Sequence, residues 1–362
     1  MKFVFTGGGS AGHVTPNIAI MNEIRKLQED YSFDYIGSEA GIEKNIIGAI
    51  EDINYHSIRT GKLRRYFSLK NFTDPFKVLL GYKDAVNTLR KIKPDVVFSK
   101  GGFVSVPVVY AARKLKIPVI AHESDMTPGL ANKLSKKCAD KICVTFPETL
   151  THLPENLGVL TGSPIRAELL CGNSVKARNM LHFDSKPVIL VMGGSLGSVA
   201  INKAIRENLA TLTEKYNIIH LCGKNNLDEA ASKQSNQVFL SYKQFEFITD
   251  ELPDFLALAD FVISRAGANA IHEFLALHKP MILIPLPAGS SRGDQILNSE
   301  SFKSRGFALV LKEEDVTPDT LKSAISQLVE RKADMIQAMK SDTSALGAAE
   351  KIAKMLIEKA TV

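Results

Sequence analysis

The sequence predicts an α/β protein with two doubly wound domains, each built on a parallel sheet that helices cover on both faces. Apolar, β-branched runs alternate with stretches of helical periodicity along the chain, which is the pattern of such sheets. A strand, glycine loop and helix at the start of the chain recur near its middle. The length of 362 residues also fits two domains, at roughly 150 residues each.

The first half opens with a strand predicted over 2–6, a glycine loop over 7–12 and a helix over 16–27. Four further apolar runs have the length of buried strands, at 33–37, 96–99, 119–122 and 142–145. Amphipathic stretches at 84–92 and 108–115 predict helices between them. This alternation favours a parallel sheet.

The second half restarts the pattern with a strand over 188–192, a glycine loop over 193–197 and a helix over 200–212. A shift of 185 residues aligns seven identical residues of the two units, Gly8, Gly9, Ser10, Gly12, Asn17, Ala19 and Ile20 on Gly193, Gly194, Ser195, Gly197, Asn202, Ala204 and Ile205. We therefore expect two similar domains. A turn signal at 160–164 predicts domains over 1–163 and 164–343, and a helix at about 344–362 could pack on either, including back on the first.

The composition is that of an ordinary globular protein, with 45% hydrophobic and 23% charged residues. No apolar stretch approaches the roughly 18 to 20 residues of a membrane-spanning helix, and glycines interrupt the run that would begin a signal peptide. We expect a cytosolic protein whose four cysteines are reduced and structural. The net charge of +6 is compatible with nucleic acid, anionic lipid or a phosphorylated substrate.

Residues 7–12 satisfy the pattern G-x-G-x-x-G between a strand and a helix. The backbone N–H groups of such a loop and the positive end of the helix bind anions such as a diphosphate. One interpretation is a dinucleotide site in which Glu39 holds a ribose, and another is a tight turn without a ligand. A P-loop nucleotidase is not indicated, because no G-x-x-x-x-G-K-[ST] motif occurs.

A third glycine site follows the apolar run 261–263, where a helix is predicted to start near Gly267. Glu273 would lie almost two turns into this helix, where its carboxylate could accept hydrogen bonds from a nucleotide ribose. Gln295 and Asn298 are three residues apart, so one helical face could present both amides to a sugar. Each of these residues could also be an ordinary solvated side chain.

Together these motifs resemble those of the MurG glycosyltransferases, over nearly the whole length of the chain. The similarity is carried by three glycine loops and three further segments: 7–16, 101–107 and 193–198, then 122–133, 264–273 and 295–298. Two positions depart from the family pattern. Asp125 stands where many members have Asn, and Ser10-Ala11 replaces a more usual Thr-Gly.

The resemblance implies a GT-B fold, in which two Rossmann-like domains face a cleft. It also implies transfer of N-acetylglucosamine (GlcNAc) from UDP-GlcNAc to the C4 hydroxyl of the N-acetylmuramic acid (MurNAc) of lipid I, undecaprenyl-pyrophosphoryl-MurNAc-pentapeptide. The transfer inverts the anomeric centre and produces lipid II for peptidoglycan. The C-terminal domain would bind the donor and the N-terminal domain the acceptor.

The resemblance also assigns residues to the donor and the acceptor. Ser195 and Arg166 would contact the diphosphate, Ile248 the uracil, Glu273 the ribose, and Gln295 with Asn298 the GlcNAc ring. The remaining donor-binding positions are Ser10, Ala11, Gly12, Gly267, Ala268, Asn269, Ala270, Ile271 and His272. The acceptor-side positions are Gly101, Gly102, His122, Asp125 and Asn132.

Departure of UDP requires stabilisation of the leaving diphosphate, which many glycosyltransferases provide with a metal held by Asp-x-Asp. This sequence has no such pair, so we predict catalysis without a metal or other cofactor, through a helix N-terminus and Arg166. His13 is the first candidate for the base and Glu123 the second. Alternatively, His13 could bind the loop backbone and Glu123 could cap a strand end.

A lipid acceptor requires contact with a membrane surface. The segment 58–82 interleaves basic with apolar residues, Arg59, Lys62, Arg64, Arg65, Lys70 and Lys77 with Leu63, Tyr66, Phe67, Leu69, Phe72, Phe76, Leu79 and Leu80. This composition suits an anionic interface, although a helix that packs into the domain would look similar. We expect a peripheral protein on the cytoplasmic face of the membrane and no nucleic-acid partner.

Three alternatives remain open from the sequence. A UDP-GlcNAc 2-epimerase on the same fold would share the donor site. A non-catalytic nucleotide-sugar sensor or membrane scaffold would bind UDP-GlcNAc without transfer. A dehydrogenase would use the first glycine loop for a dinucleotide.

Overall fold

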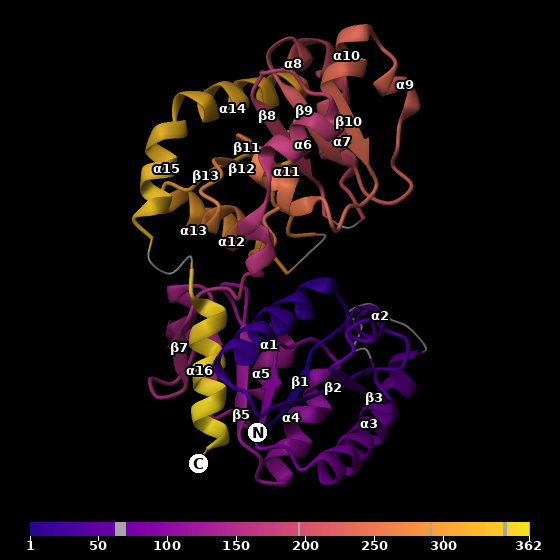
Figure 1. Cartoon of the computed structure of the whole chain (residues 1–362), viewed down its shortest axis with the longest axis vertical. Coiled ribbons are helices and arrows are strands. Elements are labelled where there is room, and N and C mark those ends of the chain that lie inside the picture. Colours follow the sequence, from indigo (N-terminus) through magenta and orange to yellow (C-terminus); the bar gives the residue numbers. More distant parts are fainter. Residues whose placement is uncertain (62–69, 195, 290–291, 343–345, 362) are drawn as a thin grey trace. The chain divides into compact units, whose positions relative to one another are not determined.

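The computed structural model describes residues 1–61, 70–194, 196–289, 292–342 and 346–361. The chain forms two compact units (Figure 1). Unit 1 contains Met1–Arg166 and Leu346–Val362, and unit 2 contains Ala167–Ala345. Each unit has one sheet of parallel strands with helices around it, which confirms the predicted fold class.

Unit 1 contains a seven-stranded sheet of order β3-β2-β1-β4-β5-β6-β7. Its strands are β1 Lys2–Thr6, β2 Ser32–Ser38, β3 Ile53–Ile58, β4 Val96–Ser99, β5 Val119–Glu123, β6 Lys141–Val144 and β7 Gly158–Leu160. Its helices are η1 Ala11–His13, α1 Thr15–Leu27, α2 Ile42–Ile47, α3 Lys70–Ile92, α4 Ser105–Lys114, α5 Leu130–Ser135, η2 Pro147–His152 and α16 Ala348–Ala360. All neighbouring strands are parallel, as the buried apolar runs predicted.

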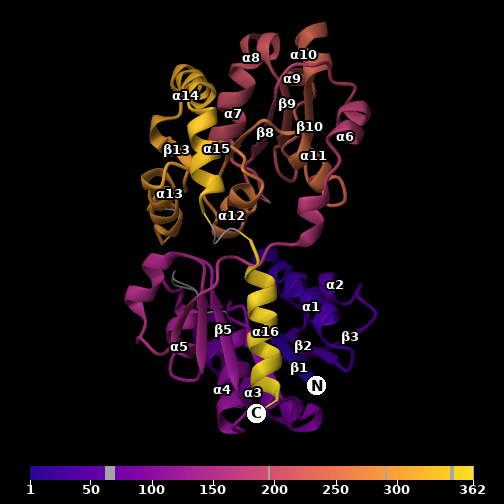
Figure 2. The ribbon, with the colours of Figure 1, turned by 60° about the vertical axis from the view of Figure 1, so that its left-hand side comes forward.

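Helix α16 belongs to unit 1, although more than 180 residues separate it from the rest of that unit. Figure 2 shows it beside the strands of unit 1. Its apolar face, with Ile352 and Leu356, packs into the core that contains Phe3 and Ile20. This helix therefore completes one side of the first sheet.

Unit 2 contains a six-stranded parallel sheet of order β10-β9-β8-β11-β12-β13. Its strands are β8 Val188–Met192, β9 Asn217–Leu221, β10 Tyr242–Phe245, β11 Phe261–Ser264, β12 Met281–Leu283 and β13 Ala308–Val310. Its helices are η3 Ala167–Cys171, α6 Ser174–Leu181, α7 Val199–Glu207, α8 Leu209–Lys215, α9 Glu229–Ser232, α10 Asn236–Ser241, α11 Leu252–Leu258, α12 Ala268–Ala276, α13 Asp294–Ser304, η4 Glu313–Asp315, α14 Pro318–Glu330 and α15 Lys332–Lys340.

The two sheets share one topology around their first strand. In unit 1, β1 lies between β2 and β4, and in unit 2, β8 lies between β9 and β11. The strand order reverses direction at these points, so the loops after the two central strands separate there. In open α/β sheets, ligands bind at the carboxyl ends of strands beside such a point.

The helix predicted over 200–212 is instead two helices, α7 and α8, which meet at Asn208. The amide of Asn208 donates hydrogen bonds to the carbonyl oxygens of Ala204 and Pro318, both at 3.0 Å. This side chain competes with the helix for backbone partners, which explains the break. Across the described residues, we find no helix with the length and apolarity needed to cross a membrane.

Candidate functional site

The loops after β8, β11 and β12 meet at the carboxyl edge of the sheet in unit 2. Ser264, at the end of β11, lies opposite Met192 at the end of β8. The Arg265 N–H donates to the carbonyl oxygen of Met192 at 3.3 Å, and the Ile284 N–H donates to that of Ser264 at 2.8 Å. Adjacent strands thus hold three loops side by side.

Two glycines in the loops after β8 and β11 face open space. A Cβ added to Gly194 or to Gly267 would meet no atom of the described residues within 4 Å. Gly267 is also the N-cap of α12, where its lack of a side chain leaves the first-turn N–H groups without a side-chain cap. Those N–H groups carry partial positive charge, so this point suits a phosphate group.

Helix α12 places some of the residues predicted to bind UDP-GlcNAc at the surface and buries others. Asn269, Ala270 and Glu273 are half-buried, whereas Ile271 and His272 are buried. The Nδ1–H of His272 donates to the carbonyl oxygen of Ala268 at 2.8 Å, and its ring packs edge-on against Phe302. The His272 side chain therefore stabilises the helix, and a ligand would meet only the backbone there.

Gln295 and Asn298 lie on α13, as the spacing predicted. The Gln295 side-chain oxygen accepts a hydrogen bond from the Leu286 N–H at 3.1 Å. Asn298 is fully buried, and its amide donates to the carbonyl oxygen of Ala266 at 3.2 Å. Burial of Asn298 therefore favours a role in holding the Gly267 loop over direct contact with a sugar.

Arg265 is a residue of this edge that the sequence analysis did not select. Its guanidinium donates to the Ser198 hydroxyl at 2.6 Å and to the carbonyl oxygens of Ile284 and Pro285 at 3.1 and 3.4 Å. It also contacts the Glu313 carboxylate. Arg265 thus ties the loops after β8, β11, β12 and β13 together. A cation directly after a buried strand and before a glycine could have indicated it.

The remaining donor-side residues are placed as follows. Ile248 is buried and follows β10 at the same carboxyl edge, beside the exposed Phe247. Ser195 lies outside the described residues. Arg166 is half-buried and is the last residue of unit 1 before the chain enters unit 2.

The first glycine loop, in unit 1, is filled by the protein itself. The Gly9 N–H donates to the Glu43 carboxylate at 3.2 Å, and a Cβ on Gly8 would lie 2.6 Å from the carboxyl carbon of Glu43. A Cβ on Gly9 would meet the Phe103 ring at 2.8 Å. A phosphate about 4 Å from that carboxylate would be repelled by roughly 4 kcal/mol at an effective dielectric constant of 20. This geometry disfavours the dinucleotide alternative.

His13 ends the short helix η1 that follows this loop, and it is half-buried. Its Nδ1 lies 2.8 Å from the Ser10 hydroxyl oxygen. In the tautomer whose Nδ1–H donates to Ser10, Nε2 carries the lone pair that a base needs. Ser10 and Ala11 are exposed and Gly12 is half-buried, so all three border the same surface.

Glu123 lies at the end of β5 and is only 5% exposed. Its carboxylate accepts hydrogen bonds from the N–H groups of Asp125 and Gly129 at 3.0 and 2.8 Å, and from the Asn132 amide at 2.8 Å. Burial raises the pKa of Glu123, against the lowering effect of the bond from Asn132. These contacts hold the turn 124–129 and favour a positioning role over that of a base.

The other acceptor-side residues surround this turn. His122 is fully buried, and its Nε2–H donates to the Gly162 carbonyl oxygen at 3.1 Å. Gly101 and Gly102 have φ angles of +90° and +82°, which side chains rarely adopt. Asp125 is half-buried, and its carbonyl oxygen accepts a hydrogen bond from the Thr149 hydroxyl at 3.3 Å.

Lys100 is a second residue that sequence analysis missed. It directly precedes the Gly101-Gly102 pair, is 2% exposed, and donates to the Ser124 hydroxyl. Burial lowers the pKa of Lys100 to about 8, although the carboxylates of Glu123 and Asp125 act in the opposite direction. Its position in the sequence, between a strand and a pair of glycines, could have indicated Lys100 as a site residue.

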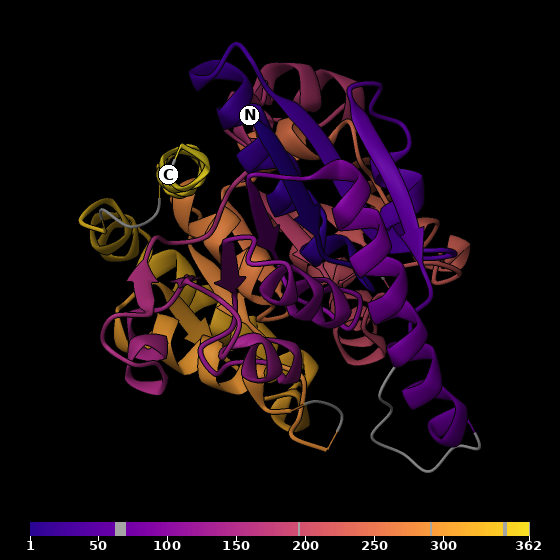
Figure 3. The same ribbon diagram turned by 90° about the horizontal axis from the view of Figure 1, so that it is seen from below.

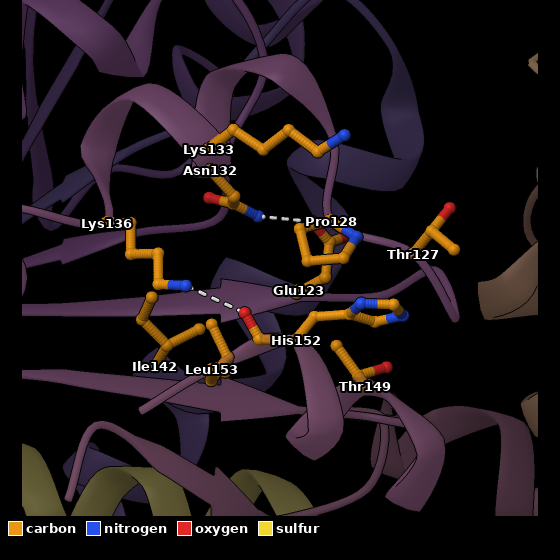
Figure 4. Close-up of a pocket in the computed structure, with 10 residues that line it drawn as sticks. All are labelled: Glu123, Thr127, Pro128, Asn132, Lys133, Lys136, Ile142, Thr149, His152 and Leu153. Carbon is orange, nitrogen blue, oxygen red and sulfur yellow. Dashed lines mark hydrogen bonds between the residues drawn. The ribbon is translucent and has the colours of Figure 1, made fainter. Parts of the chain in front are cut away.

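A cavity of about 270 Å³ lies beside the same turn (Figure 4). Glu123 and Asn132 line it with Ile142 and Leu153, and the cationic Lys133 and Lys136 stand around it. The Lys136 amine donates to the His152 carbonyl oxygen at 2.7 Å. The cavity thus combines an apolar wall with cationic side chains.

The described residues contain no group of three or more His, Cys, Asp or Glu side chains that could hold a metal ion. Catalysis without a metal stays a prediction.

Two family models match the chain. The glycosyltransferase family 28 N-terminal domain matches residues 3–144, and the family 28 C-terminal domain matches residues 188–356. Among curated proteins, the chain is 57% identical over 339 residues to a Clostridium botulinum protein, covering 93% of this chain and 92% of that one. It is 53% identical over 360 residues to a Clostridium novyi protein, covering 99% and 98%. Both carry the name UDP-N-acetylglucosamine–N-acetylmuramyl-(pentapeptide) pyrophosphoryl-undecaprenol N-acetylglucosamine transferase.

Solved structures agree at the level of the fold. The crystal structure of Acinetobacter baumannii MurG matches with a TM-score of 0.77 and 24% identity, covering 99% of both chains. A UDP-GlcNAc 2-epimerase from Neisseria meningitidis, bound to UDP-GlcNAc, matches with a TM-score of 0.67 and 14% identity, also covering 99% of both. At these identities the likeness shows the fold alone, whereas the curated relatives decide the family. The chain therefore belongs to glycosyltransferase family 28 and, within it, to the MurG glycosyltransferases.

Proposed function

We propose that this protein transfers GlcNAc from UDP-GlcNAc to the C4 hydroxyl of the MurNAc of lipid I, with inversion, and so produces lipid II. One observation carries the proposal: identity of 53 to 57% over nearly the whole chain to transferases of that name. The arrangement of glycine loops in the two units supports it.

Unit 2 holds the donor in this proposal. The N–H groups at the start of α12 face the diphosphate, where Gly267 leaves space for it. Glu273, nearly two turns further along α12, accepts hydrogen bonds from the ribose hydroxyls, and the backbone of Ile248 meets the uracil. Preorganised N–H groups stabilise the charge that develops on UDP as it leaves. Arg265 keeps the loops in register for that purpose.

Unit 1 provides the acceptor side. The C4 oxygen of MurNAc attacks C1 of GlcNAc, the bond from C1 to the β-phosphate oxygen breaks, and the hydroxyl proton passes to Nε2 of His13. A histidine suits this step because its ordinary pKa lies near the working pH. Glu123 and Lys100 position the turn 124–129, in which Asp125 lies, rather than exchange protons.

Contact with the lipid acceptor requires an interfacial surface, which we assign to α3. Figure 3 shows that the N-terminal part of α3 projects away from the rest of unit 1. Phe76 is 69% exposed and Leu79 is 65% exposed on this part. The basic residues proposed for the same surface at 62–65 lie outside the described residues. This surface would hold the enzyme on the cytoplasmic face of the membrane, as a peripheral protein attracted by anionic lipid.

The decisive experiment incubates the protein with labelled UDP-GlcNAc and a short-chain lipid I analogue in the presence of a chelator. Formation of labelled lipid II supports the proposal. Release of N-acetylmannosamine without acceptor would identify an epimerase instead, and binding without turnover would identify a sensor. Activity that the chelator abolishes and Mg²⁺ restores would contradict metal independence.

A further inference from the structure

A buried carboxylate occupies the first glycine loop. Glu43 lies in the first turn of α2 and is fully buried. One carboxylate oxygen accepts the Gly9 N–H at 3.2 Å, and the other accepts the Ser38 N–H at 3.0 Å and the Ser38 hydroxyl. Within the described ranges, no lysine or arginine forms an ion pair with it. The carboxyl group is therefore held by two backbone N–H groups and one hydroxyl, as a bound anion would be.

The Glu43 carboxyl group fills the space beside Gly8. A Cβ on Gly8 would lie 2.6 to 2.9 Å from all three atoms of the Glu43 carboxyl group. The loop is supported from below by the Tyr35 hydroxyl, which donates to the Gly7 carbonyl oxygen at 2.7 Å. The Tyr55 hydroxyl donates to the Ser38 carbonyl oxygen at 2.6 Å. The glycine loop thus keeps the form of a phosphate-binding loop, but the Glu43 carboxyl group takes the place of a phosphate.

The segment that this carboxylate fixes leads directly to His13. Gly9, which donates to Glu43, precedes Ser10, whose hydroxyl lies 2.8 Å from Nδ1 of His13. The His13 N–H also donates to the Ser10 carbonyl oxygen at 3.1 Å. A shift of Gly9 would therefore move the Ser10 hydroxyl and the Ser10 carbonyl group, which both bond to His13.

We propose that Glu43 is a positioning residue for His13: its carboxylate replaces a phosphate in the first glycine loop and fixes the Gly8–Ser10 segment that orients the base. This proposal rests on the transferase function proposed above. It assigns the glycine loop of unit 1 to the support of catalysis, and it leaves the binding of the donor diphosphate to unit 2.

The test compares Glu43→Gln and Glu43→Ala with Glu51→Gln, a charge-matched control at an exposed residue of the same unit. In Glu43→Gln, the new NH₂ group faces either the Gly9 N–H or the Ser38 donors, so one hydrogen bond is lost and the loop moves. We expect kcat for lipid II formation to fall about tenfold to a hundredfold, the cost of a misplaced catalytic group. KM for UDP-GlcNAc should stay within about twofold, because the proposal leaves donor binding to unit 2.

Two further measurements separate positioning from a general loss of structure. Formate should restore part of the kcat of Glu43→Ala by occupying the vacated N–H groups, whereas chloride at equal ionic strength should restore less. The ring-nitrogen NMR signals of His13 should differ between wild type and Glu43→Gln, and this comparison needs no transferase activity.

The proposal is overturned if Glu43→Gln keeps the kcat and the His13 signals of the wild type, and this outcome decides even if Glu43→Ala does not fold. It is also overturned if kcat and UDP affinity fall together with the melting temperature and formate restores nothing. A wild-type protein without transferase activity would refute the proposed function instead, and the His13 spectra would still test Glu43.

Discussion

The glycine loops of the two units differ in what lies beside them. In unit 1, a Cβ on Gly9 would meet the Phe103 ring at 2.8 Å, whereas in unit 2 a Cβ on the equivalent Gly194 would meet nothing described within 4 Å. Both loops follow the first strand of a sheet with the same strand order. A glycine loop therefore indicates that another group lies close to the backbone. The elements that follow the loop decide whether that group belongs to the protein or to a ligand.

A second difference lies beneath the two loops. A shift of 185 residues aligns Asn17 with Asn202, and it also aligns Tyr35 with His220. The Asn17 amide donates to the Tyr35 hydroxyl at 3.1 Å, and Asn202 Oδ1 lies 2.9 Å from Nε2 of His220. The same two positions thus bond to each other in both units, but only unit 2 has a histidine there.

The largest expected effect concerns the chemistry assigned to unit 1. We expect His13→Ala to lower kcat by about 10²- to 10⁴-fold, the usual contribution of a general base. UDP binding, measured by calorimetry, should be unchanged because we assign the donor to unit 2. Retention of most of the wild-type kcat would remove His13 from the mechanism.

The Gly267 loop of unit 2, which follows β11, should be sensitive to charge. Gly267→Asp adds a carboxylate where α12 begins, at a backbone conformation that any residue can adopt. Repulsion of the diphosphate should weaken UDP binding about tenfold to a hundredfold. Gly267→Asn is the matched neutral control, and equal affinity of the two variants for UDP would show that no phosphate binds there.

Alanine substitutions should distinguish the first glycine loop of unit 1 from the Gly267 loop of unit 2 by their effect on stability. Gly8→Ala forces a Cβ against the buried Glu43 and should lower the free energy of unfolding by about 2 kcal/mol. Gly267→Ala meets open space and should leave the free energy of unfolding nearly unchanged. Urea titration measures both, and equal destabilisation would contradict the contrast between the loops.

The exposed apolar residues of the two units should differ at a membrane. Leu79→Asp on α3 should reduce binding to vesicles of anionic lipid about tenfold. The change removes an exposed apolar side chain that would enter the membrane, and it adds a negative charge that anionic lipid repels. Leu240→Asp on α10, which is 55% exposed in unit 2, is the matched control. Co-sedimentation with these vesicles should show weaker binding for Leu79→Asp and unchanged binding for Leu240→Asp.

The smallest effect concerns acid stability. Burial lowers the pKa of His220 to about 3, and the positive charge of Arg206 acts in the same direction. Unfolding restores its ordinary pKa near 6.5, so below that pH the unfolded state binds a proton that the folded state refuses, and stability falls as the pH falls. Between pH 6.5 and 5.5 the loss through His220 is about 1 kcal/mol.

His220→Gln should remove that part of the pH dependence, as measured by urea titration at the two pH values. The neighbours that face this ring are the Tyr242 hydroxyl, at 2.9 Å, and Asn202. At Tyr35, the matching position of unit 1, burial raises the pKa, so nothing there titrates in this range. An unchanged slope in His220→Gln would contradict the assignment.

Local sequence predicted the parts of the fold that depend on local patterns. The apolar runs at 2–6 and 188–192 became central strands, because strands buried on both faces are continuously hydrophobic. The edge strand β3, with the sequence Ile-Asn-Tyr-His-Ser-Ile, was not predicted, because its polar residues interrupt the continuous apolar run of a buried strand. Asn208 broke a predicted helix through a contact with Pro318, 110 residues away.

The sequence predicted where the candidate site lies in the fold, but it did not predict the contacts that each side chain makes there. Gly267 and Glu273 could be placed on one helix from spacing alone. The burial of Asn298, the lysine at position 100 and the carboxylate of Glu43 depend on contacts between distant segments. Glu43 is 34 residues from the glycine whose N–H it accepts, and no local period connects them.

The path of the chain also sets an order of assembly during synthesis. Unit 2 is one continuous stretch, so its core can close as soon as the ribosome has released residues 167–345. Unit 1 begins first but lacks the apolar face of α16, including Ile352 and Leu356, until translation has passed residue 360. The nascent unit 1 therefore carries an uncovered hydrophobic surface throughout the synthesis of unit 2, and chaperones have that interval in which to bind it.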